Sequence, residues 1–417
     1  MMSGAKKMVP KRRFKEFLNA GDWEQRELAE LCNVYDGTHQ TPRYTNSGVM
    51  FVSVENIKTL ESDKYISEDD FKNEFKIFPE FGDILLTRIG DVGSANIILD
   101  NIKRAYYVSL ALLKPKGINS LFLLALLSSA SVQSEIWKRT LHIAFPKKIN
   151  KNEISKVIVS KPSILEQKKI GELIYALDQI ITLHQRKLDK LQATKKALLQ
   201  EMFPEEGQDK PKRRFKGFTD AWEQRKFLDL LDAQNGIRRG PFGSSLKKDS
   251  FVKKSDYVVY EQQNAIYDNY ETRYFISKEK YNELIRFNIQ PGDFIMSGAG
   301  TIGRISMVPD GIKKGVFNQA LIRFKVNKDS INPLYFLKFM QSDMMQKQLT
   351  QANPGSAMTN LVPMDELKKW DVTIPSLEEQ NRISTFINQI DAFITLHQRK
   401  LDKLKNLKQA YLNEMFV

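Results

Sequence analysis

The sequence predicts an α+β protein with an internal repeat. Two mixed α/β globular domains are separated by two long antiparallel helices that form an intramolecular coiled coil with pseudo-two-fold symmetry. Three observations predict this fold. Residues 181–191 recur letter for letter at 394–404, displaced by 213 positions (394 − 181). An apolar heptad pattern runs through both copies, and a basic Pro-Lys-Arg-Arg-Phe-Lys motif occurs at 10–15 and again at 211–216. A copy at a fixed offset indicates that one structural unit is used twice.

Each copy of the repeated stretch belongs to a long helix. Apolar side chains recur at steps of three and four residues over 170–198 and over 383–411, with Lys, Arg, Asp and Gln between them. This heptad spacing is typical of helices that pair. Ser163 and Ser376, each preceded by proline, are predicted helix caps. Each helix should contain about 40 residues and extend about 60 Å. Solvated helices or a dimerisation coil are alternatives, but two copies in one chain favour pairing with each other.

The connection between the helices predicts their direction. The second globular domain joins the end of helix one, near Phe203, to the start of helix two, near Ser376. An antiparallel pair brings these two ends together, whereas a parallel pair would require the domain to span the whole helix. Antiparallel pairing also places each basic opening motif beside a helix end. It puts His184 and His397 at the middle of their apolar heptad patterns, so we expect these histidines to approach each other.

Composition narrows the possible classes of protein. The chain has 417 residues, enough for two or three domains, and a net charge of +14, which points towards nucleic acid. A single cysteine, Cys32, excludes a disulfide within the chain and fits a reducing, cytoplasmic environment. With four histidines and one cysteine, a Cys/His zinc site is not expected, and we expect no bound metal. No run of 18 apolar residues indicates a membrane span.

The repeats divide the chain into predicted segments. Basic runs at 10–17 and 211–218 mark the start of each half, and we favour solvated linkers over DNA contacts for both. The predicted segments are an opening segment (1–21), a first globular domain (22–160), helix one (161–203), a linker that repeats the opening (204–221), a second globular domain (222–373) and helix two (374–417).

The two globular domains share several predicted elements. A strand, a glycine turn and a second strand are expected at 82–98 and at 292–306. A helix should begin after Asn119 in the first domain and after Asn332 in the second, and each domain should end in a short strand. Another strand is expected at 51–57. The segments 35–79 and 233–290 show little similarity. The sequence therefore predicts one scaffold used twice with two different inserts.

Two short motifs resemble catalytic or cofactor sites. The G-x-G-x-x-G pattern at 298–303 precedes a predicted strand rather than a helix and lacks the following acid, so we interpret it as a glycine hairpin. Asn332-Pro-Leu-Tyr335 is one letter from an amino-methyltransferase site, but its copy, Asn119-Ser-Leu-Phe122, cannot be such a site. A helix cap explains both. No phosphate-binding G-x-x-x-x-G-K-[ST] loop is present.

Polar and basic loops at matching places in both halves are the remaining candidate sites. Arg, Lys, Gln, Asn, Ser and Thr are the residue types that contact phosphates and base edges, although loops of this composition are often merely exposed. The candidate DNA-binding residues are Thr38, His39, Gln40, Arg43, Arg88, Lys147, Lys148, Lys151, Asn235, Arg238, Arg239, Ser244, Lys247, Lys248, Arg304, Ser356 and Asn360.

The whole pattern resembles the specificity subunit of type I restriction–modification systems, and the likeness covers essentially the full chain. It rests on the doubled Trp-Glu-Gln-Arg openings and the doubled Pro-Ser-x-x-Glu-Gln helix entries. The motifs are found at 23–26, 222–225, 162–167 and 375–380, with Tyr-Asp-Gly-Thr-His at 35–39 and Gly-Pro-Phe-Gly-Ser at 240–244.

The resemblance implies a non-catalytic subunit. Each globular segment would be a target recognition domain for one half of a bipartite double-stranded DNA site, and the helices would act as spacer and as docking site for two modification subunits. Those partners would carry the S-adenosylmethionine chemistry, and restriction subunits would use ATP and Mg²⁺, so we expect no cofactor on this chain. The alternatives are a stand-alone methyltransferase or nuclease and a coiled-coil assembly protein without DNA binding.

Overall fold

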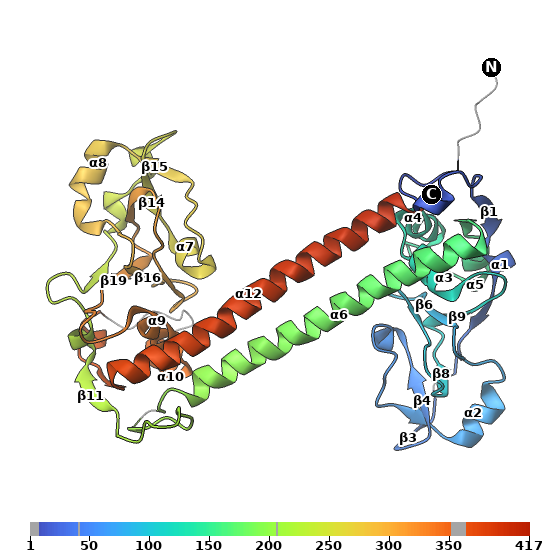
Figure 1. Cartoon of the computed structure of the whole chain (residues 1–417), viewed down its shortest axis with the longest axis horizontal. Helices are drawn as coiled ribbons and strands as arrows, with labels where there is room; N and C mark the ends of the chain where they lie inside the picture. Colours follow the sequence, from blue (N-terminus) through green and yellow to red (C-terminus); the bar gives the residue numbers. More distant parts are fainter. Residues whose placement is uncertain (1–7, 41, 206, 352–363) are drawn as a thin grey trace. The chain divides into compact units, whose positions relative to one another are not determined.

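The computed structural model describes residues 8–40, 42–205, 207–351 and 364–417. The chain divides into two compact units. Unit 1 comprises Met1–Arg186 and Gln398–Val417, and unit 2 comprises Lys187–His397. Each unit therefore contains one globular domain and a part of both long helices, as the colours of Figure 1 show. Among the described residues, no single helix has the length and apolarity to cross a membrane; the bent pair Ser120–Leu127 and Ala130–Arg139 meets those two criteria only when taken together.

Unit 1 contains two four-stranded sheets and one two-stranded pair. The main sheet has the order β2-β9-β6-β7, the second sheet has the order β3-β5-β4-β8, and β1 pairs with β10. The strands are β1 (Glu24–Glu27), β2 (Cys32–Asp36), β3 (Tyr44–Thr45), β4 (Val49–Val52), β5 (Tyr65–Ile66), β6 (Ile84–Thr87), β7 (Ala95–Ile97), β8 (Arg104–Tyr106), β9 (Leu110–Pro115) and β10 (Ile158–Lys161). The helices are α1 (Leu28–Leu31), α2 (Glu68–Glu74), α3 (Ser120–Leu127), α4 (Ala130–Arg139) and α5 (Lys151–Ser155).

Unit 2 repeats this arrangement strand for strand. Its main sheet has the order β12-β19-β16-β17, its second sheet β13-β15-β14-β18, and β11 pairs with β20. The strands are β11 (Glu223–Lys226), β12 (Ile237–Arg239), β13 (Phe251–Val252), β14 (Tyr257–Tyr260), β15 (Tyr274–Ile276), β16 (Phe294–Ser297), β17 (Ile305–Met307), β18 (Lys314–Phe317), β19 (Leu321–Phe324) and β20 (Asp371–Ile374). The helices are α7 (Gln262–Tyr267), α8 (Lys278–Glu283), α9 (Pro333–Gln341), α10 (Asp343–Gln351) and α11 (Met364–Leu367), and short 3₁₀ turns complete both units.

The inserts that look unrelated in sequence thus adopt one topology. Each insert supplies three short strands that complete the second sheet, where β4 is parallel to β8 and β14 is parallel to β18. The strand expected at 51–57 is shorter than predicted, because Val49–Val52 forms β4 and Val54–Asn56 forms a 3₁₀ turn. Buried apolar residues on a pleated strand suffice for this topology, so it tolerates wide changes of sequence.

The main sheet of each unit is covered on both faces. In unit 1, Ile84 and Leu86 of β6 face the helices α3 and α4, whereas Leu85 faces the second sheet. This alternation is the expected consequence of the two-residue period of a strand. In unit 2, Phe294 and Ile295 divide between the same two layers. A helix layer, a main sheet and a second sheet therefore build each domain.

The two long helices have the predicted lengths and caps. Helices α6 (Ile164–Glu201) and α12 (Leu377–Glu414) contain 38 residues each. The hydroxyl oxygens of Ser163 and Ser376 accept hydrogen bonds from the third residue of each helix at 3.4 Å. The glycine hairpins, the helix caps Asn119 and Asn332 and the closing strands are also confirmed.

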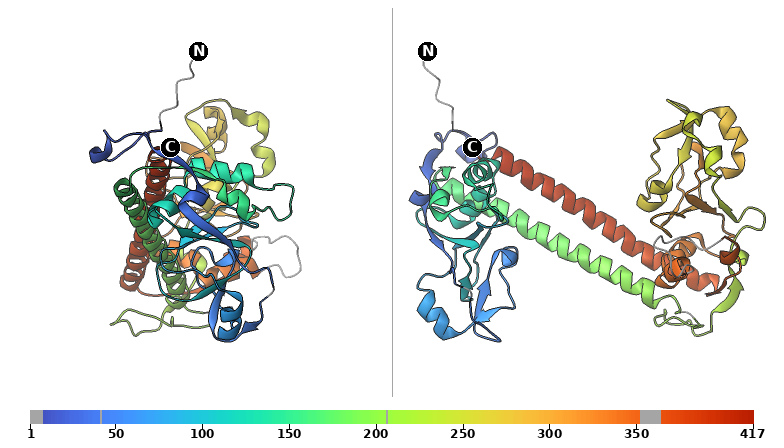
Figure 2. Two further views of the ribbon diagram at one scale, coloured as in Figure 1. Left: turned by 90° about the vertical axis from the view of Figure 1, so that its right-hand side faces the viewer. Right: turned by 180° about the vertical axis from the view of Figure 1, so that it is seen from behind.

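Within each unit the helix segments run antiparallel. In unit 1 the first part of α6 lies beside the last part of α12, where Lys408 Nζ is 2.5 Å from Asp178 Oδ1. In unit 2 the last part of α6 lies beside the first part of α12, where Lys195 Nζ is 2.6 Å from Asp391 Oδ1. These two ion pairs are copies of each other at the 213-residue offset (391 − 178 and 408 − 195). Figures 1 and 2 show these helix segments side by side from three directions.

The basic opening motifs bind the ends of the long helices and are not solvated linkers. In unit 1, Arg13 donates from Nε and Nη2 to the two carboxylate oxygens of Glu166, both at 2.7 Å, and both side chains are buried. The Arg12 guanidinium binds Glu414 at the end of α12. Our preference for a solvated linker was therefore wrong, because these cations bind carboxylates at the ends of α6 and α12. The predicted position of the opening beside a helix end is confirmed.

The basic motif of unit 2 binds the ends of the long helices in the same way. Arg214 binds Glu379 through two hydrogen bonds of 2.8 and 2.7 Å, and Arg213 binds Glu201 at 2.5 Å. The glutamine that follows each buried glutamate also has a repeated role. Gln167 accepts a hydrogen bond from the backbone N–H of Asn119, and Gln380 accepts one from Asn332. The Pro-Ser-x-x-Glu-Gln motif therefore connects each long helix to its opening segment and to the domain helix α3 or α9.

Candidate nucleic-acid interface

One edge of the main sheet gathers most of the candidate loops of unit 1. Strands β2 and β6 are both antiparallel to β9, so both end at the same edge, where β9 begins. The loop after β2 contains residues 37–43, and the turn after β6 contains residues 88–94. Loops that leave one sheet edge lie close together, as in other binding sites that are built on a rigid scaffold.

The turn after β6 is fixed from several sides. Thr87 Oγ1 accepts a hydrogen bond from the backbone N–H of Ser94 at 2.9 Å. Gln133 of α4 donates to the carbonyl oxygen of Gly93 at 2.8 Å. Unit 2 has the same arrangement, in which Gln346 donates to Gly303 at 3.0 Å. An added Cβ at either glycine would lie 2.8 Å from the glutamine oxygen, so the end of the glutamine side chain would have to move away.

Arg88 holds this edge together, and its side chain is buried. Its guanidinium binds Asp36 at the end of β2 and donates from Nε to the carbonyl oxygen of Ile149 at 3.1 Å. The Arg88 side chain is 7% exposed. Its DNA contact stays a prediction that this burial disfavours, because a charge buried with a paired carboxylate is costly to remove from its partner.

The second basic loop of unit 1 is attached to the same turn. The backbone N–H of Gly90 donates to the carbonyl oxygen of Lys147 at 2.8 Å, and Leu141 donates to Lys148 at 2.7 Å. Lys147 and Lys148 are both exposed, and Lys147 Nζ lies 4.7 Å from the Trp137 ring centre. Lys151 begins α5 and is half-buried. The structure therefore brings these lysines to the edge that the first loop occupies.

The loop after β2 presents the remaining candidates of unit 1. Thr38 is half-buried and forms a β-bridge with Tyr107, and its hydroxyl accepts a hydrogen bond from Gln40. His39, Gln40 and Arg43 are exposed. Their side chains are thus free of the core at the position where a ligand could approach them.

The equivalent edge of unit 2 is built in the same way. Strands β12 and β16 are both antiparallel to β19, so the loops after Arg239 and after Ser297 leave one edge. The loop after β12 packs against the start of β19, because Gly240 donates to the carbonyl oxygen of Leu321 at 2.9 Å. Gln262 at the start of α7 donates to the carbonyl oxygen of Ala299 in the glycine turn. Both loops are therefore held in defined positions.

The candidate residues of unit 2 differ in their exposure. Arg239, Ser244, Lys247 and Arg304 are exposed at this edge, whereas Arg238 is half-buried. Arg238 pairs in register with the buried Arg323, and burial lowers the pKa of Arg323, with the positive charge of Arg238 adding to the effect.

Asn235 is displaced from the candidate surface. It precedes β12, and so lies at the end of that strand opposite to Arg239, where its side chain accepts a hydrogen bond from Arg238 at 3.4 Å. Its carbonyl oxygen accepts a hydrogen bond from Arg323 at 3.3 Å. Asn235 therefore stabilises the turn before β12 and does not belong to the basic loop, so its DNA contact stays a prediction. The structure does not describe the side chain of Lys248, and Ser356 and Asn360 lie outside the described residues.

Three exposed apolar side chains at these edges were missed by sequence reasoning. Ile143 and Phe145 in the second loop of unit 1 are 100% and 104% exposed, and Phe242 after β12 is 88% exposed. Only polar and basic residues of these loops were considered as contacts. The signal that could have found the two phenylalanines is an aromatic residue next to proline within a short basic loop.

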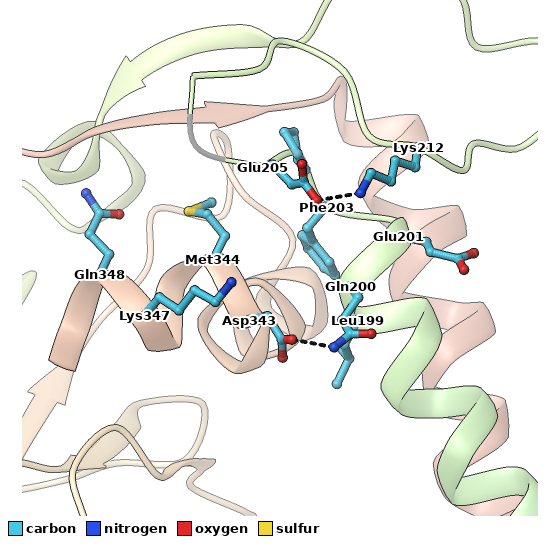
Figure 3. A pocket seen from close by; sticks show the side chains of 11 residues that line it. Leu199, Gln200, Glu201, Phe203, Glu205, Lys212, Asp343, Met344, Lys347 and Gln348 are labelled. Atoms are coloured by element: carbon cyan, nitrogen blue, oxygen red, sulfur yellow. Dashed lines mark hydrogen bonds and ion pairs between the residues drawn. The ribbon is translucent and has the colours of Figure 1, made fainter. Parts of the chain in front are cut away.

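A separate cavity of about 690 Å³ lies in unit 2 between the end of α6 and α10 (Figure 3). Its three carboxylates, those of Glu201, Glu205 and Asp343, each have a hydrogen-bond or ion-pair partner. Glu205 binds Lys212 at 2.5 Å, and Asp343 accepts a hydrogen bond from Gln200 at 2.6 Å. These pairs stabilise the end of the helix and provide no nucleophile with an adjacent base. Over the described ranges, no group of three His, Cys, Asp or Glu side chains could hold a metal ion.

The expected approach of His184 to His397 involves one residue from each unit and stays a prediction. His397 is buried, and His184 is half-buried. Both therefore avoid full exposure, as residues in an apolar heptad pattern should.

Comparison with known proteins gives one consistent result. The family described as the type I restriction modification DNA specificity domain matches residues 20–193 and 220–406. A protein of Methanocaldococcus jannaschii provisionally named the type I restriction enzyme MjaX specificity subunit is 21% identical over 94% of this chain and 92% of its own length. The type I restriction enzyme EcoBI specificity subunit of Escherichia coli is 28% identical over 34% of this chain and 30% of its own length.

Solved structures share the fold. The S subunit of a type I restriction-modification system from M. genitalium superposes with a TM-score of 0.63 at 13% identity, covering 98% of this chain and 99% of that one. A chain from a study of complex assembly and conformational transition of the type I restriction-modification system gives a TM-score of 0.51 at 15% identity, with 94% and 96% covered.

Proposed function

Because the chain belongs to the family of type I restriction-modification DNA specificity subunits, we propose that it recognises a bipartite double-stranded DNA target and docks two modification subunits and the restriction subunits. Each globular domain recognises one half of the target. The observation that carries this proposal is the repeated sheet edge. In each unit, two strands of the main sheet end at the same edge and are followed by basic loops. These strands are β2 and β6 in unit 1 and β12 and β16 in unit 2, and the loop sequences differ between the units. One scaffold with two loop sets suits two different half-sites.

The chain acts without chemistry of its own. In the cavity of unit 2 the carboxylates Glu201, Glu205 and Asp343 each bind a side-chain donor, and the G-x-G-x-x-G segment forms a β-hairpin between β16 and β17. We assign the S-adenosylmethionine, ATP and Mg²⁺ to the partner subunits and the complex to the cytoplasm. A methylation assay on the purified chain, with S-adenosylmethionine added, tests the competing assignment of a stand-alone methyltransferase.

The long helices offer a docking surface that is repeated like the rest of the chain. Ile180 and Leu183 of α6 are 42% and 65% exposed, and Phe393 and Leu396 of α12 are 54% and 45% exposed. These pairs stand at the 213-residue offset (393 − 180 and 396 − 183). Exposed apolar side chains at equal positions of two helices favour two copies of one partner, because each copy would find the same surface.

Exchanging the second domain should change one half of the target only. Residues 222–373 would be replaced by the corresponding domain of a relative, with both junctions at the closing β11–β20 pair. Methylated sites in a host genome, mapped before and after the exchange, should keep the half-site that unit 1 recognises and acquire a new second half. A change in both halves, or in neither, would contradict the assignment of one half-site to each domain.

Replacing Arg239 by alanine should weaken binding at the second half-site. This exposed arginine ends β12 at the basic edge. If it contacts a base, we expect a loss of about 1–3 kcal/mol at one position of the target. If it contacts a phosphate, binding to all sequences should weaken alike and the salt dependence should decrease. Titrations of the assembled complex with matched and single-mismatch duplexes at several salt concentrations distinguish these results.

Arg286 provides the matched control for this measurement. It is an exposed arginine of unit 2 in the 3₁₀ turn Ile285–Phe287, outside the loops that follow β12 and β16. Arg286→Ala should leave both affinity and specificity unchanged. Equal losses in the two variants would mean that the charge of the whole unit, rather than this edge, accounts for binding.

A further inference from the structure

Each unit presents one fully exposed phenylalanine at the edge that carries the basic loops. Phe145 in unit 1 is 104% exposed, and Phe242 in unit 2 is 88% exposed. Exposed apolar residues are common on protein surfaces. These two differ from scattered cases, because each stands in a loop whose ends are held by hydrogen bonds and whose neighbours are cations.

The loop that carries Phe145 is anchored at its base. The backbone N–H of Leu141 donates to Lys148, and the N–H of Ile149 donates to Arg88 at 2.9 Å. Between these anchors the tip holds Phe145 and the equally exposed Ile143. The anchors attach the tip to the buried Arg88, which itself binds Asp36. A projection fixed at its base loses little conformational entropy when it enters a ligand.

The loop that carries Phe242 is held by two flanking glycines. An added Cβ at Gly240 would lie 1.9 Å from the carbonyl oxygen of Asn318, and one at Gly243 would lie 2.5 Å from the side-chain oxygen of Gln319. The backbone on both sides of Phe242 therefore lies directly against the loop before β19. With its neighbours packed in this way, the phenyl ring is directed outward instead of folding back onto the domain.

Exposed basic residues lie close to both phenylalanines in the chain. Lys147 and Lys148 are exposed next to Phe145, and Arg239 and Lys247 are exposed on either side of Phe242. An apolar side chain with a basic rim matches the interior of a base stack between two phosphate backbones. A protein partner would instead be expected to cover a broader apolar surface with fewer charges.

We propose that Phe145 and Phe242 are wedges, each of which inserts between stacked base pairs of one half of the bound duplex. This inference rests on the proposed DNA recognition. Inserted apolar side chains unstack a base step and bend the duplex, which allows more protein surface to contact the DNA. The deformation also depends on sequence, so each wedge adds discrimination at a step that no polar side chain contacts.

The test uses the complex of this chain with its modification subunits. The duplex contains the target sequence that is identified by mapping the methylated sites. The base analogue 2-aminopurine, whose fluorescence increases when it is unstacked, is placed in turn at each position of both half-sites. We expect a several-fold increase at one step in each half. Phe145→Ala should abolish the increase in the first half only, and Phe242→Ala in the second half only. Each variant should bind about tenfold or more weakly.

Controls separate the possible origins of a signal. A modification subunit that flips its target base would also increase fluorescence, but that increase should survive both alanine variants. Phe81→Ala in unit 1 and Leu228→Ala in unit 2 remove exposed apolar side chains, 65% and 43% exposed, at the other end of each main sheet. Both should leave the fluorescence and the affinity unchanged.

The outcomes distinguish the wedge from the function on which it rests. Tight, sequence-specific binding without any step that depends on Phe145 or Phe242 overturns the wedge and leaves DNA recognition intact. Absence of specific binding by the unsubstituted complex overturns both. Loss of modification-subunit binding by Phe145→Ala or Phe242→Ala in the absence of DNA also overturns the wedge, because the ring would then contact protein.

Discussion

Replacing Arg13 by alanine is expected to destabilise unit 1 by about 3–5 kcal/mol. The substitution removes both hydrogen bonds to Glu166, whose carboxylate is fully buried. The carboxylate would remain inside the unit without its counter-charge, and that is the costly half of a broken buried ion pair. Denaturant titration followed by tryptophan fluorescence measures the loss of stability, with Trp23 and Trp137 as the reporters within unit 1.

The neighbouring arginine is the internal control. Arg12 belongs to the same motif and binds Glu414, but the two side chains are 53% and 37% exposed. Water and salt screen such a pair, so Arg12→Ala should cost about 1 kcal/mol or less. Comparable losses in Arg12→Ala and Arg13→Ala would refute the interpretation that burial of the pair causes the effect.

Unit 2 provides a second comparison. Glu379 accepts hydrogen bonds from Arg214 and also from the indole N–H of Trp222 at 3.2 Å. In unit 1 the indole N–H of Trp23 is buried and has no hydrogen-bond partner among the described residues. Arg214→Ala would therefore leave its carboxylate with one remaining donor. We expect this variant to cost less than Arg13→Ala.

The scaffold could be predicted from the sequence because its determinants are local or repeated. Heptad spacing and serine caps predict α6 and α12, and the helix caps Asn119 and Asn332 predict α3 and α9. The 213-residue offset links these elements into a repeat without any knowledge of their contacts. Each of these signals lies within a few residues of the element that it determines.

Contacts between side chains that are far apart in the sequence could not be predicted in the same way. Arg13 and Arg88 look like exposed cations in sequence, but each meets a carboxylate that the fold brings close, Glu166 and Asp36. Composition alone does not distinguish a buried ion pair from a DNA contact. The common topology of the two inserts was missed for a related reason, since strand pairing between distant segments depends on burial pattern more than on residue identity.

The second large effect is expected on the binding of the modification subunits to the long helices. Leu396→Asp is expected to remove one of two modification subunits from the complex, and Leu183→Asp to remove the other. Each substitution places a charge within an exposed apolar pair, Phe393–Leu396 or Ile180–Leu183, which a docked partner would bury. Loss of a central apolar contact together with burial of a charge should cost 2 kcal/mol or more, about thirtyfold in affinity. Native mass spectrometry should show one modification subunit for each single variant and none for the double variant.

Leu407→Asp is the matched control for assembly. Leu407 is an exposed leucine of α12, 40% exposed, and the residue at the repeated position, 194, is Thr194. A surface that binds two copies of one partner should be apolar at both positions of the repeat, whereas the pair Leu407 and Thr194 is apolar at only one. Leu407→Asp should therefore retain both modification subunits. If it lost a subunit as Leu396→Asp does, docking would depend on general apolarity of the helices. If all three single variants retained both subunits, the docking surface would have to lie away from Ile180, Leu183, Phe393 and Leu396.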